Sequence, residues 1–387
     1  MHFSAPDFNR NIDRRYTDSV KWAGAGVKFG ADVFPMWVAD MDFASADCIL
    51  AALHRRLQNP VFGYPDHDQE AHLASVDWWQ KKYDWAVAPE EIILVQGVVP
   101  ALFAAVRAFS GPGDGIVVMP PIYPPFFAAV ENQERRLLSV PLLNSSDQGR
   151  YEIDFPELMQ KLPGARMLLL CSPHNPVGRV WEPKDLQNLV ELCRLHGVQV
   201  VSDEIHADLT SPECRHTPLG LIDPGSIVLA SASKSFNIPG LGGAVAWIRD
   251  PEQKAVYVAE LRRSGVLGAN TMAKSAMVAA WREGEPWLQA LRQYLDANLR
   301  DIAAFLCEEI PAIRFSKPEF GYLAWLDLRA LGWSDSTIQQ RLVAAGLGLS
   351  PGPSFGHEGS GFVRLNYGTT GSYLRHGLEL LRQALAQ

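Results

Sequence analysis

The chain has 387 residues, of which 47% are hydrophobic and 20% charged, which excludes the intrinsically disordered classes. Single hydrophobic cores stop growing at roughly 250–300 residues, so this length predicts a large domain and a smaller one. The net charge of −8 and the lack of a dense Lys/Arg block argue against a nucleic-acid or anionic-membrane partner.

The five cysteines are scattered, and none forms a CxxC pair. This pattern disfavours a disulfide framework or a structural zinc site, so we expect no metal. The first fifteen residues are polar and charged, and no apolar run approaches the length of a membrane span. We therefore expect a cytoplasmic protein.

Residues 1–45 contain few periodic signals and many turn formers, which predicts an extended N-terminal arm. The spacing of Gly24, Gly26 and Gly30 is only superficially like a nucleotide-binding loop. No strand precedes these glycines and no clear helix follows them, so a phosphate loop is a poor interpretation.

Residues 46–284 alternate short apolar runs with amphipathic helical patterns, which predicts a large α/β domain. The predicted strands are residues 92–95, 116–119, 167–171, 198–202 and 227–230. Strand–helix alternation indicates a mainly parallel sheet with helices on both faces. Ligands bind at the carboxyl ends of such strands, so the functional residues should directly follow these runs.

Residues 285–387 read as a smaller α+β C-terminal domain. A long helical stretch at 285–309 leads to an apolar run at 321–328. A helix at 336–345, a strand at 362–365 and a final helix complete this part.

Lys234 follows the predicted strand 227–230 and lies among hydroxyl and apolar groups. A poorly solvated lysine has a lowered pKa and can attack an aldehyde to form an imine. The neighbouring hydroxyls of Ser231 and Ser233 can hold a phosphate close by. Taken alone, a loop lysine beside turn-capping serines is the simpler interpretation.

Asp203 follows the predicted central strand 198–202, where a buried carboxylate needs a cationic partner. A protonated pyridine nitrogen would serve, because this pair makes the ring an electron sink. The alternative is a structural aspartate that caps the next helix. His206 follows three residues later, and a single histidine is usually structural.

Asn175 and Tyr123 follow two further predicted strands. The Asn-Pro-Val-Gly turn that begins at Asn175 leaves the strand sharply and keeps the amide free to donate to a ligand. The proline-rich loop around Tyr123 can fix its ring for stacking on a flat heterocycle. A plain turn and a rigid surface loop are the alternatives.

Two positions are suited to anionic groups. Val98 and Val99 precede Pro100 at the start of a helix, whose free N–H groups and dipole can bind a phosphate. Arg364 lies in the apolar run 362–365, where its guanidinium needs a carboxylate. That carboxylate belongs either to an amino-acid substrate or to a structural ion pair.

These signals are stronger together than alone, because all but Arg364 follow predicted parallel strands. Together they supply an amine that can form an imine, an anion for a ring nitrogen and an aromatic ring for stacking. They also supply a hydrogen-bond donor for a ring oxygen, a binding site for a phosphate and a guanidinium for a carboxylate. This combination favours an enzyme that uses pyridoxal 5′-phosphate (PLP) on an amino acid.

The chain resembles the fold-type I PLP-dependent enzymes, the aspartate aminotransferase superfamily, over nearly its whole length. It is most similar to the cystathionine β-lyase branch of C–S lyases, which is related to class I/II aminotransferases. The matching segments are PMWVADMDF at 35–43, FGYP at 62–65, DEIHADL at 203–209 and SKSFNIPGL at 233–241. The resemblance implies the PLP-transferase type I fold. We expect residues 1–45 to form the arm and part of the small domain, residues 46–284 the large PLP-binding domain and residues 285–387 the small C-terminal domain.

The resemblance also implies roles for residues around the cofactor ring. Lys234 would hold PLP as a Schiff base and move the α-proton, and Asp203 would pair with the pyridine nitrogen. Tyr123 would stack on the ring. Asn175 would form a hydrogen bond with the ring hydroxyl. His206 would lie close to that hydroxyl, and many relatives carry a tyrosine in place of this histidine.

Other roles concern the two anionic ends of the ligands. The resemblance assigns the PLP phosphate to a set of backbone and hydroxyl groups: Val98, Val99, Ser231 and Ser233. Tyr64 would reach the same phosphate from the neighbouring subunit of a homodimer, and Arg364 would hold the substrate carboxylate.

The implied reaction is β-elimination, which converts L-cystathionine or a related cysteine S-conjugate into a thiol, pyruvate and ammonia. Many aminotransferases of this fold carry Arg or Lys eight positions after the Schiff-base lysine, whereas this chain has Gly242. A class I/II aminotransferase with the same residues is the first alternative. A regulatory protein that retains the fold is the second.

Overall fold

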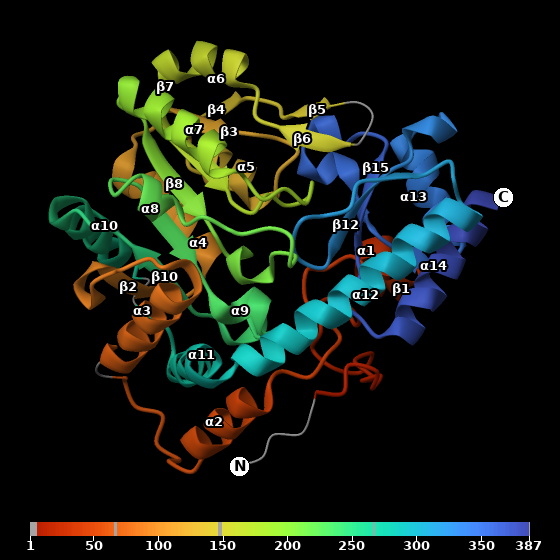
Figure 1. Cartoon of the computed structure of the whole chain (residues 1–387), viewed down its shortest axis with the longest axis horizontal. Helices are drawn as coiled ribbons and strands as arrows, with labels where there is room; N and C mark the ends of the chain where they lie inside the picture. The colour runs from red at the N-terminus through yellow and green to blue at the C-terminus, as the bar shows by residue number, and fades with distance from the viewer. Residues whose placement is uncertain (1–5, 66–67, 146–148, 266–267, 387) are drawn as a thin grey trace.

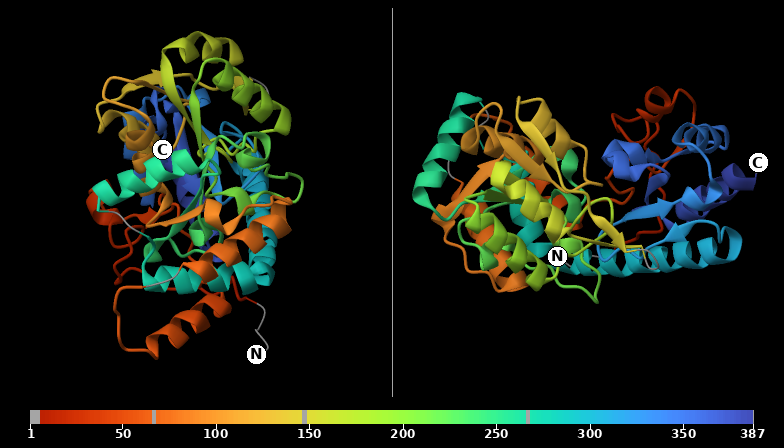
Figure 2. Two further views of the ribbon diagram at one scale, coloured as in Figure 1. Left: turned by 90° about the vertical axis from the view of Figure 1, so that its left-hand side faces the viewer. Right: turned by 90° about the horizontal axis from the view of Figure 1, so that it is seen from above.

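The computed structural model describes residues 6–65, 68–145, 149–265 and 268–386. It has two lobes, and the 25-residue helix α12 (Glu285–Glu309) runs beneath both of them (Figures 1 and 2). The larger lobe is built on a seven-stranded sheet and the smaller lobe on a four-stranded sheet.

The seven-stranded sheet is parallel except for one strand, β10. Its strands, in spatial order, are β2 (Ile92–Val95), β10 (Ala244–Trp247), β9 (Ile227–Ala230), β8 (Gln199–Asp203), β7 (Ala165–Cys171), β3 (Gly115–Val118) and β4 (Arg136–Ser139). The strands predicted at 92–95 and 227–230 have the predicted bounds, and the other three differ by one or two residues. The antiparallel β10 and the edge strand β4 were not predicted.

Both faces of this sheet are apolar and covered by helices (Figure 1). In β7, Leu168 and Leu170 pack on one face while Met167 and Leu169 pack on the other. The core of the second face includes α4 (Val98–Phe109), α5 (Pro125–Glu131) and α10 (Pro251–Arg263). The core of the first face includes α3 (Gln69–Tyr83), α7 (Pro183–Leu195) and α11 (Thr271–Glu283). This arrangement confirms the predicted α/β fold.

The smaller lobe carries an antiparallel sheet in the order β11 (Arg314–Phe315), β12 (Leu323–Asp327), β15 (Phe362–Asn366) and β14 (Ser350–Pro351). Helices α13 (Asp335–Ala344) and α14 (Gly371–Ala386) belong to this lobe. The arm joins it, because β1 (Phe34–Pro35) pairs with β13 (Leu347–Gly348). The division of the chain at 45 and 284 stays a prediction.

The remaining elements are α1 (Ala25–Phe29), α2 (Asp47–Leu57), β5 (Leu143–Ser145), β6 (Arg150–Glu152), α6 (Phe155–Lys161), α8 (Leu219–Ile222) and α9 (Ala232–Ser235). Within the described residues, no helix combines the length and apolarity needed to span a bilayer.

Candidate active site

A cavity of about 280 Å³ opens where β7, β8 and β9 end and α4 and α9 begin. Small-molecule sites occupy roughly 300–1,000 Å³, so this cavity is at the lower end of that range. The predicted site residues that line it are Val98, Val99, Tyr123, Asn175, Asp203, His206, Ser233 and Lys234. The carboxyl ends of parallel strands therefore bring together most of the residues that the sequence singled out.

Lys234 lies on the short helix α9, which begins directly after β9 and is capped by the Ser231 hydroxyl. Its Nζ donates a hydrogen bond of 2.6 Å to the carbonyl oxygen of Ala39. Burial, with a further contribution from the positive charge of Arg364, lowers the pKa of Lys234 to about 8. A lysine of this kind is partly unprotonated near neutral pH and can act as a nucleophile or a base.

Asp203 ends β8 with 5% of its surface exposed. Its carboxylate accepts a bond of 3.1 Å from the Ile205 N–H, and no Lys, Arg or His of the described chain forms an ion pair with it. Burial raises the pKa of Asp203 to about 7. A buried carboxylate without a cation is unusual, and it indicates a place for a positively charged ligand group.

Arg364 lies on β15 of the smaller lobe, with its guanidinium turned toward Asn175 of the larger lobe. Nη1 donates to Asn175 Oδ1 at 3.1 Å, and Nη2 donates to the Trp37 carbonyl at 2.9 Å. Nε has no partner, and no acidic side chain of the described residues pairs with this buried cation. Because Asn175 accepts from Arg364 through its oxygen, its NH₂ group stays available to donate to a ligand.

Two rings border the cavity beside these charges. His206 is buried with no partner for Nδ1 among the described residues, and burial lowers its pKa to about 3. It is therefore a neutral imidazole with an unused hydrogen-bonding atom. Tyr123 is largely buried, and that burial raises the pKa of its phenol, so the hydroxyl stays protonated.

The start of α4 forms the predicted anion-binding end of the cavity. Gly97, Val98 and Val99 line it, and no side chain caps the free N–H groups of the first helical turn. Gly242 also lines this end. A Cβ atom there would lie 3.1 Å from the Gln96 carbonyl oxygen, and its φ of 63° also favours glycine, so this position has little room for a side chain.

Ser231 and Tyr64, two of the predicted phosphate contacts, do not line the cavity. The Ser231 hydroxyl donates to the Gly243 carbonyl and accepts from the Ser233 N–H, so its proton is used within the chain. Tyr64 is fully exposed and does not line the cavity of its own chain. The roles of both residues at a phosphate stay predictions.

Sequence reasoning missed contributions made by the backbone and by distant residues. Ala39 lines the cavity and bonds Lys234, yet its contribution is a carbonyl oxygen rather than a side chain. Tyr322 donates to the same oxygen at 3.0 Å. The only available signal was the 37–43 segment, which was noted for its resemblance rather than for its chemistry.

The chain matches the family model "Aminotransferase class I and II" over residues 31–381. This chain belongs to the class I and II aminotransferase family. A relative named cystathionine β-lyase PatB, from Bacillus subtilis (strain 168), is 43% identical over 388 residues, covering 98% of this chain and 100% of that protein.

Two solved structures have nearly the same fold as this chain. Cystalysin from Treponema denticola, which contains a PLP cofactor, has a TM-score of 0.95 and 32% identity and covers 99% of both chains. A PLP-bound putative aminotransferase from Clostridium difficile 630 has a TM-score of 0.96 and 33% identity, covering 98% of this chain and all of that one. The predicted relationship to the PLP-dependent C–S lyases is confirmed.

Proposed function

We propose that the protein is a PLP-dependent C–S β-lyase that cleaves L-cystathionine or a related cysteine S-conjugate. The products would be a thiol, pyruvate and ammonia. The observation that carries the proposal is that one cavity contains a lysine and an aspartate whose pKa values are both shifted toward neutrality. Lys234 has its pKa lowered to about 8, and Asp203, without a cation, has its pKa raised to about 7.

The cavity has a donor set that fits PLP at each of its polar positions. Lys234 supplies the amine for the aldehyde carbon, and Asp203 supplies the anion for the pyridine nitrogen. Asn175 and His206 can bond the ring hydroxyl, and Tyr123 offers its ring for stacking. The uncapped N-terminus of α4 and Ser233 would hold the phosphate.

When bound, PLP supplies an electron sink that stabilises negative charge at the substrate Cα. Arg364 would bind the substrate carboxylate with its guanidinium and thereby fix the orientation of the Cα–H bond. Lys234 Nζ would then accept the α-proton, because its lowered pKa leaves it partly unprotonated. Asp203, once paired with the ring nitrogen, would keep that nitrogen protonated throughout.

A coupled assay tests this proposal most directly. Purified, PLP-loaded protein is given L-cystathionine in the absence of any 2-oxo acid, and pyruvate and free thiol are measured together. Equal amounts of the two products would support β-elimination. The similarity to the PLP-bound putative aminotransferase from Clostridium difficile makes transamination the second candidate. If neither product forms, but a 2-oxo acid starts amino transfer, the lyase proposal is wrong.

We also propose that the active enzyme is a homodimer in which Tyr64 serves the partner's cavity. Its support is a set of exposed apolar side chains at the end of α2 and just after it: Leu57, Val61, Phe62 and Tyr64. Mixing Lys234→Ala subunits with Tyr64→Ala subunits tests it. The mixed dimer should regain one complete site and exceed both parents in activity. No regain would indicate that Tyr64 does not act across subunits.

A further inference from the structure

Residues 37–43, here called the strap, form the part of the arm just before the larger lobe and contain no helix or strand. Their backbone is held by side chains instead. The carbonyl oxygens of residues 37–41 each accept at least one hydrogen bond from a side chain. The donors come from the N-terminal residues, from the segment after β9 and from the smaller lobe: Arg14, Lys21, Lys234, Asn237, Tyr322, Ser350, Arg364 and Asn366.

Two of these carbonyls hold the residues that the proposed reaction needs. The Ala39 carbonyl accepts from Lys234 Nζ at 2.6 Å, and the Trp37 carbonyl accepts from Arg364 Nη2 at 2.9 Å. The two acceptors are only two residues apart on one short segment. A displacement of the strap would therefore move Lys234, the proposed proton acceptor, together with Arg364, the proposed partner of the substrate carboxylate.

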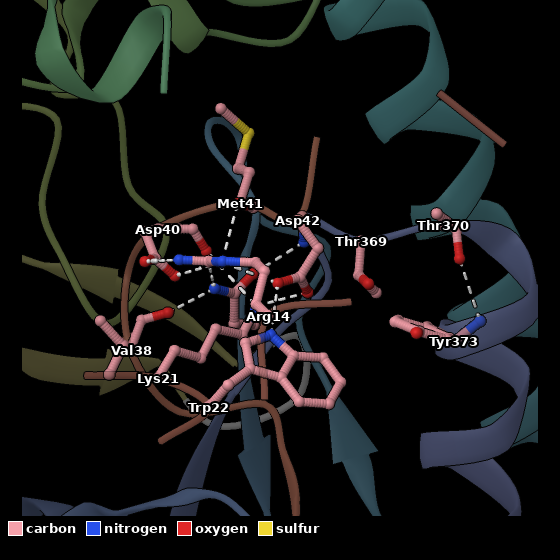
Figure 3. Close-up of polar contacts among 12 residues, drawn as sticks. Arg14, Lys21, Trp22, Val38, Asp40, Met41, Asp42, Thr369, Thr370 and Tyr373 are labelled. Carbon is pink, nitrogen blue, oxygen red and sulfur yellow. Dashed lines mark hydrogen bonds and ion pairs between the residues drawn. The ribbon is translucent and has the colours of Figure 1, made fainter. Parts of the chain in front are cut away.

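Charged side chains bind the strap to earlier residues of the arm (Figure 3). Lys21 Nζ lies 2.7 Å from Asp42 Oδ2, and the two side chains are 1% and 2% exposed. The Trp22 indole N–H donates to the other carboxylate oxygen at 2.8 Å. Although burial acts to raise it, the pKa of Asp42 is lowered by the charge and hydrogen bond of Lys21. Asp42 is therefore a fixed anion at one end of the strap.

Arg14 connects this anion to a second one, as Figure 3 shows. Its guanidinium binds both oxygens of Asp40, at 2.7 and 3.4 Å, and also Asp42 at 2.9 Å and the Met41 carbonyl at 3.2 Å. Two cations thus neutralise two anions in this group, here called the arm cluster: Arg14, Lys21, Asp40 and Asp42. At the other end of the strap, the Trp37 indole donates to the Lys21 carbonyl at 3.1 Å.

We propose that Arg14 and Lys21 are positioning residues, which fix the strap and thereby set the places of Lys234 and Arg364. Neither residue lines the cavity, so each acts through the strap backbone. This inference rests on the proposed function for its kinetic consequence. The structural part, a strap ordered by the arm cluster, stands independently of the reaction.

The test variant is Arg14→Gln, because it removes the two-pronged contact but keeps the deeply buried Lys21–Asp42 pair. The matched control is Arg15→Gln. Arg15 is the next residue, its side chain is 64% exposed, and it pairs with Asp13 on the surface. In PLP-free protein, hydrogen exchange of the strap amides should be roughly tenfold faster in Arg14→Gln, because charge-assisted bonds are lost. Arg15→Gln should exchange as the wild type does.

The kinetic measurement separates positioning from simple stability. KM for the amino-acid substrate should rise roughly tenfold in Arg14→Gln with a smaller change in kcat, and Arg14→Lys should restore part of it. Normal strap exchange in Arg14→Gln, or a lower melting temperature with unchanged KM, overturns the proposal. If the wild type shows no lyase turnover but the exchange result holds, the proposed reaction fails and the ordered strap stands.

Discussion

The arm cluster and the charged residues of the cavity are two groups of buried or partly buried charges, and they differ in how they are neutralised. In the arm cluster, Lys21 and Arg14 pair with Asp42 and Asp40, and the pKa of Asp42 is lowered despite its burial. In the cavity, burial dominates instead, raising the pKa of Asp203 to about 7 and lowering that of Lys234 to about 8. Similar desolvation therefore has opposite outcomes, depending on whether the chain itself supplies the counter-charge. The unpaired charges mark where a ligand must complete the structure.

The largest effect should come from removing the amine of Lys234, which belongs to the cavity charges that lack a counter-charge. Lys234→Ala should lower kcat by at least roughly 10²–10⁴-fold, since proton transfer by a placed base contributes that much. It should also abolish the visible absorbance of lysine-bound PLP, measured by spectrophotometry. Lys184→Ala, at an exposed position on α7, is the control. Full activity in Lys234→Ala would refute the assignment of the lysine.

Removing one charge from the arm cluster should instead reduce the stability of the folded protein. Asp42→Asn leaves Lys21 buried without its anion, so the free energy of unfolding should fall by about 3–5 kcal/mol at neutral pH. Because the folded pKa of Asp42 is lowered, this contribution is present above the unfolded pKa and lost as pH falls through the folded value. Urea unfolding should therefore show the two proteins converging in acid. A constant difference at every pH would contradict the ion-pair explanation.

Asp203 should show the reverse pH dependence in PLP-free protein. Because its folded pKa is raised from 3.8 to about 7, the folded state holds a proton that the unfolded chain releases. The free energy of unfolding should fall by up to about 4 kcal/mol as pH rises across that window. Asp203→Asn should remove this slope, as measured by denaturant unfolding at several pH values. Parallel curves for the two proteins would mean that Asp203 already has a counter-charge.

The smallest effect expected is on substrate binding through Arg364. Arg364→Lys keeps the charge but loses the planar fork, so KM for the amino acid should rise by about 10–10²-fold. Steady-state kinetics would measure this, with Arg375→Lys on the exposed side of α14 as the control. An unchanged KM would place the substrate carboxylate elsewhere.

Much of the site could be predicted because parallel strands deliver their last residues to one edge. Lys234, Asp203 and Asn175 were found in this way, each directly after an apolar run. Strand β10 was missed because its four residues, AVAW, follow two glycines and include two alanines, which are poor strand formers. The arm cluster was missed because Arg14 and Asp42 lie 28 residues apart in a segment without periodicity. Ala39 contributes a carbonyl, which every residue possesses, so its identity carried no signal.

The carbonyl oxygen of Ala39 accepts two hydrogen bonds, and this has a consequence for the mobility of Lys234. Tyr322 donates to this acceptor at 3.0 Å alongside the lysine. When Lys234 swings away toward an aldehyde, the oxygen keeps one donor, so no buried acceptor is stranded. The departure of the lysine is thus decoupled from the integrity of the strap. The nitrogen can alternate between a resting place on the protein and a covalent one on its ligand, while the scaffold beneath it stays still.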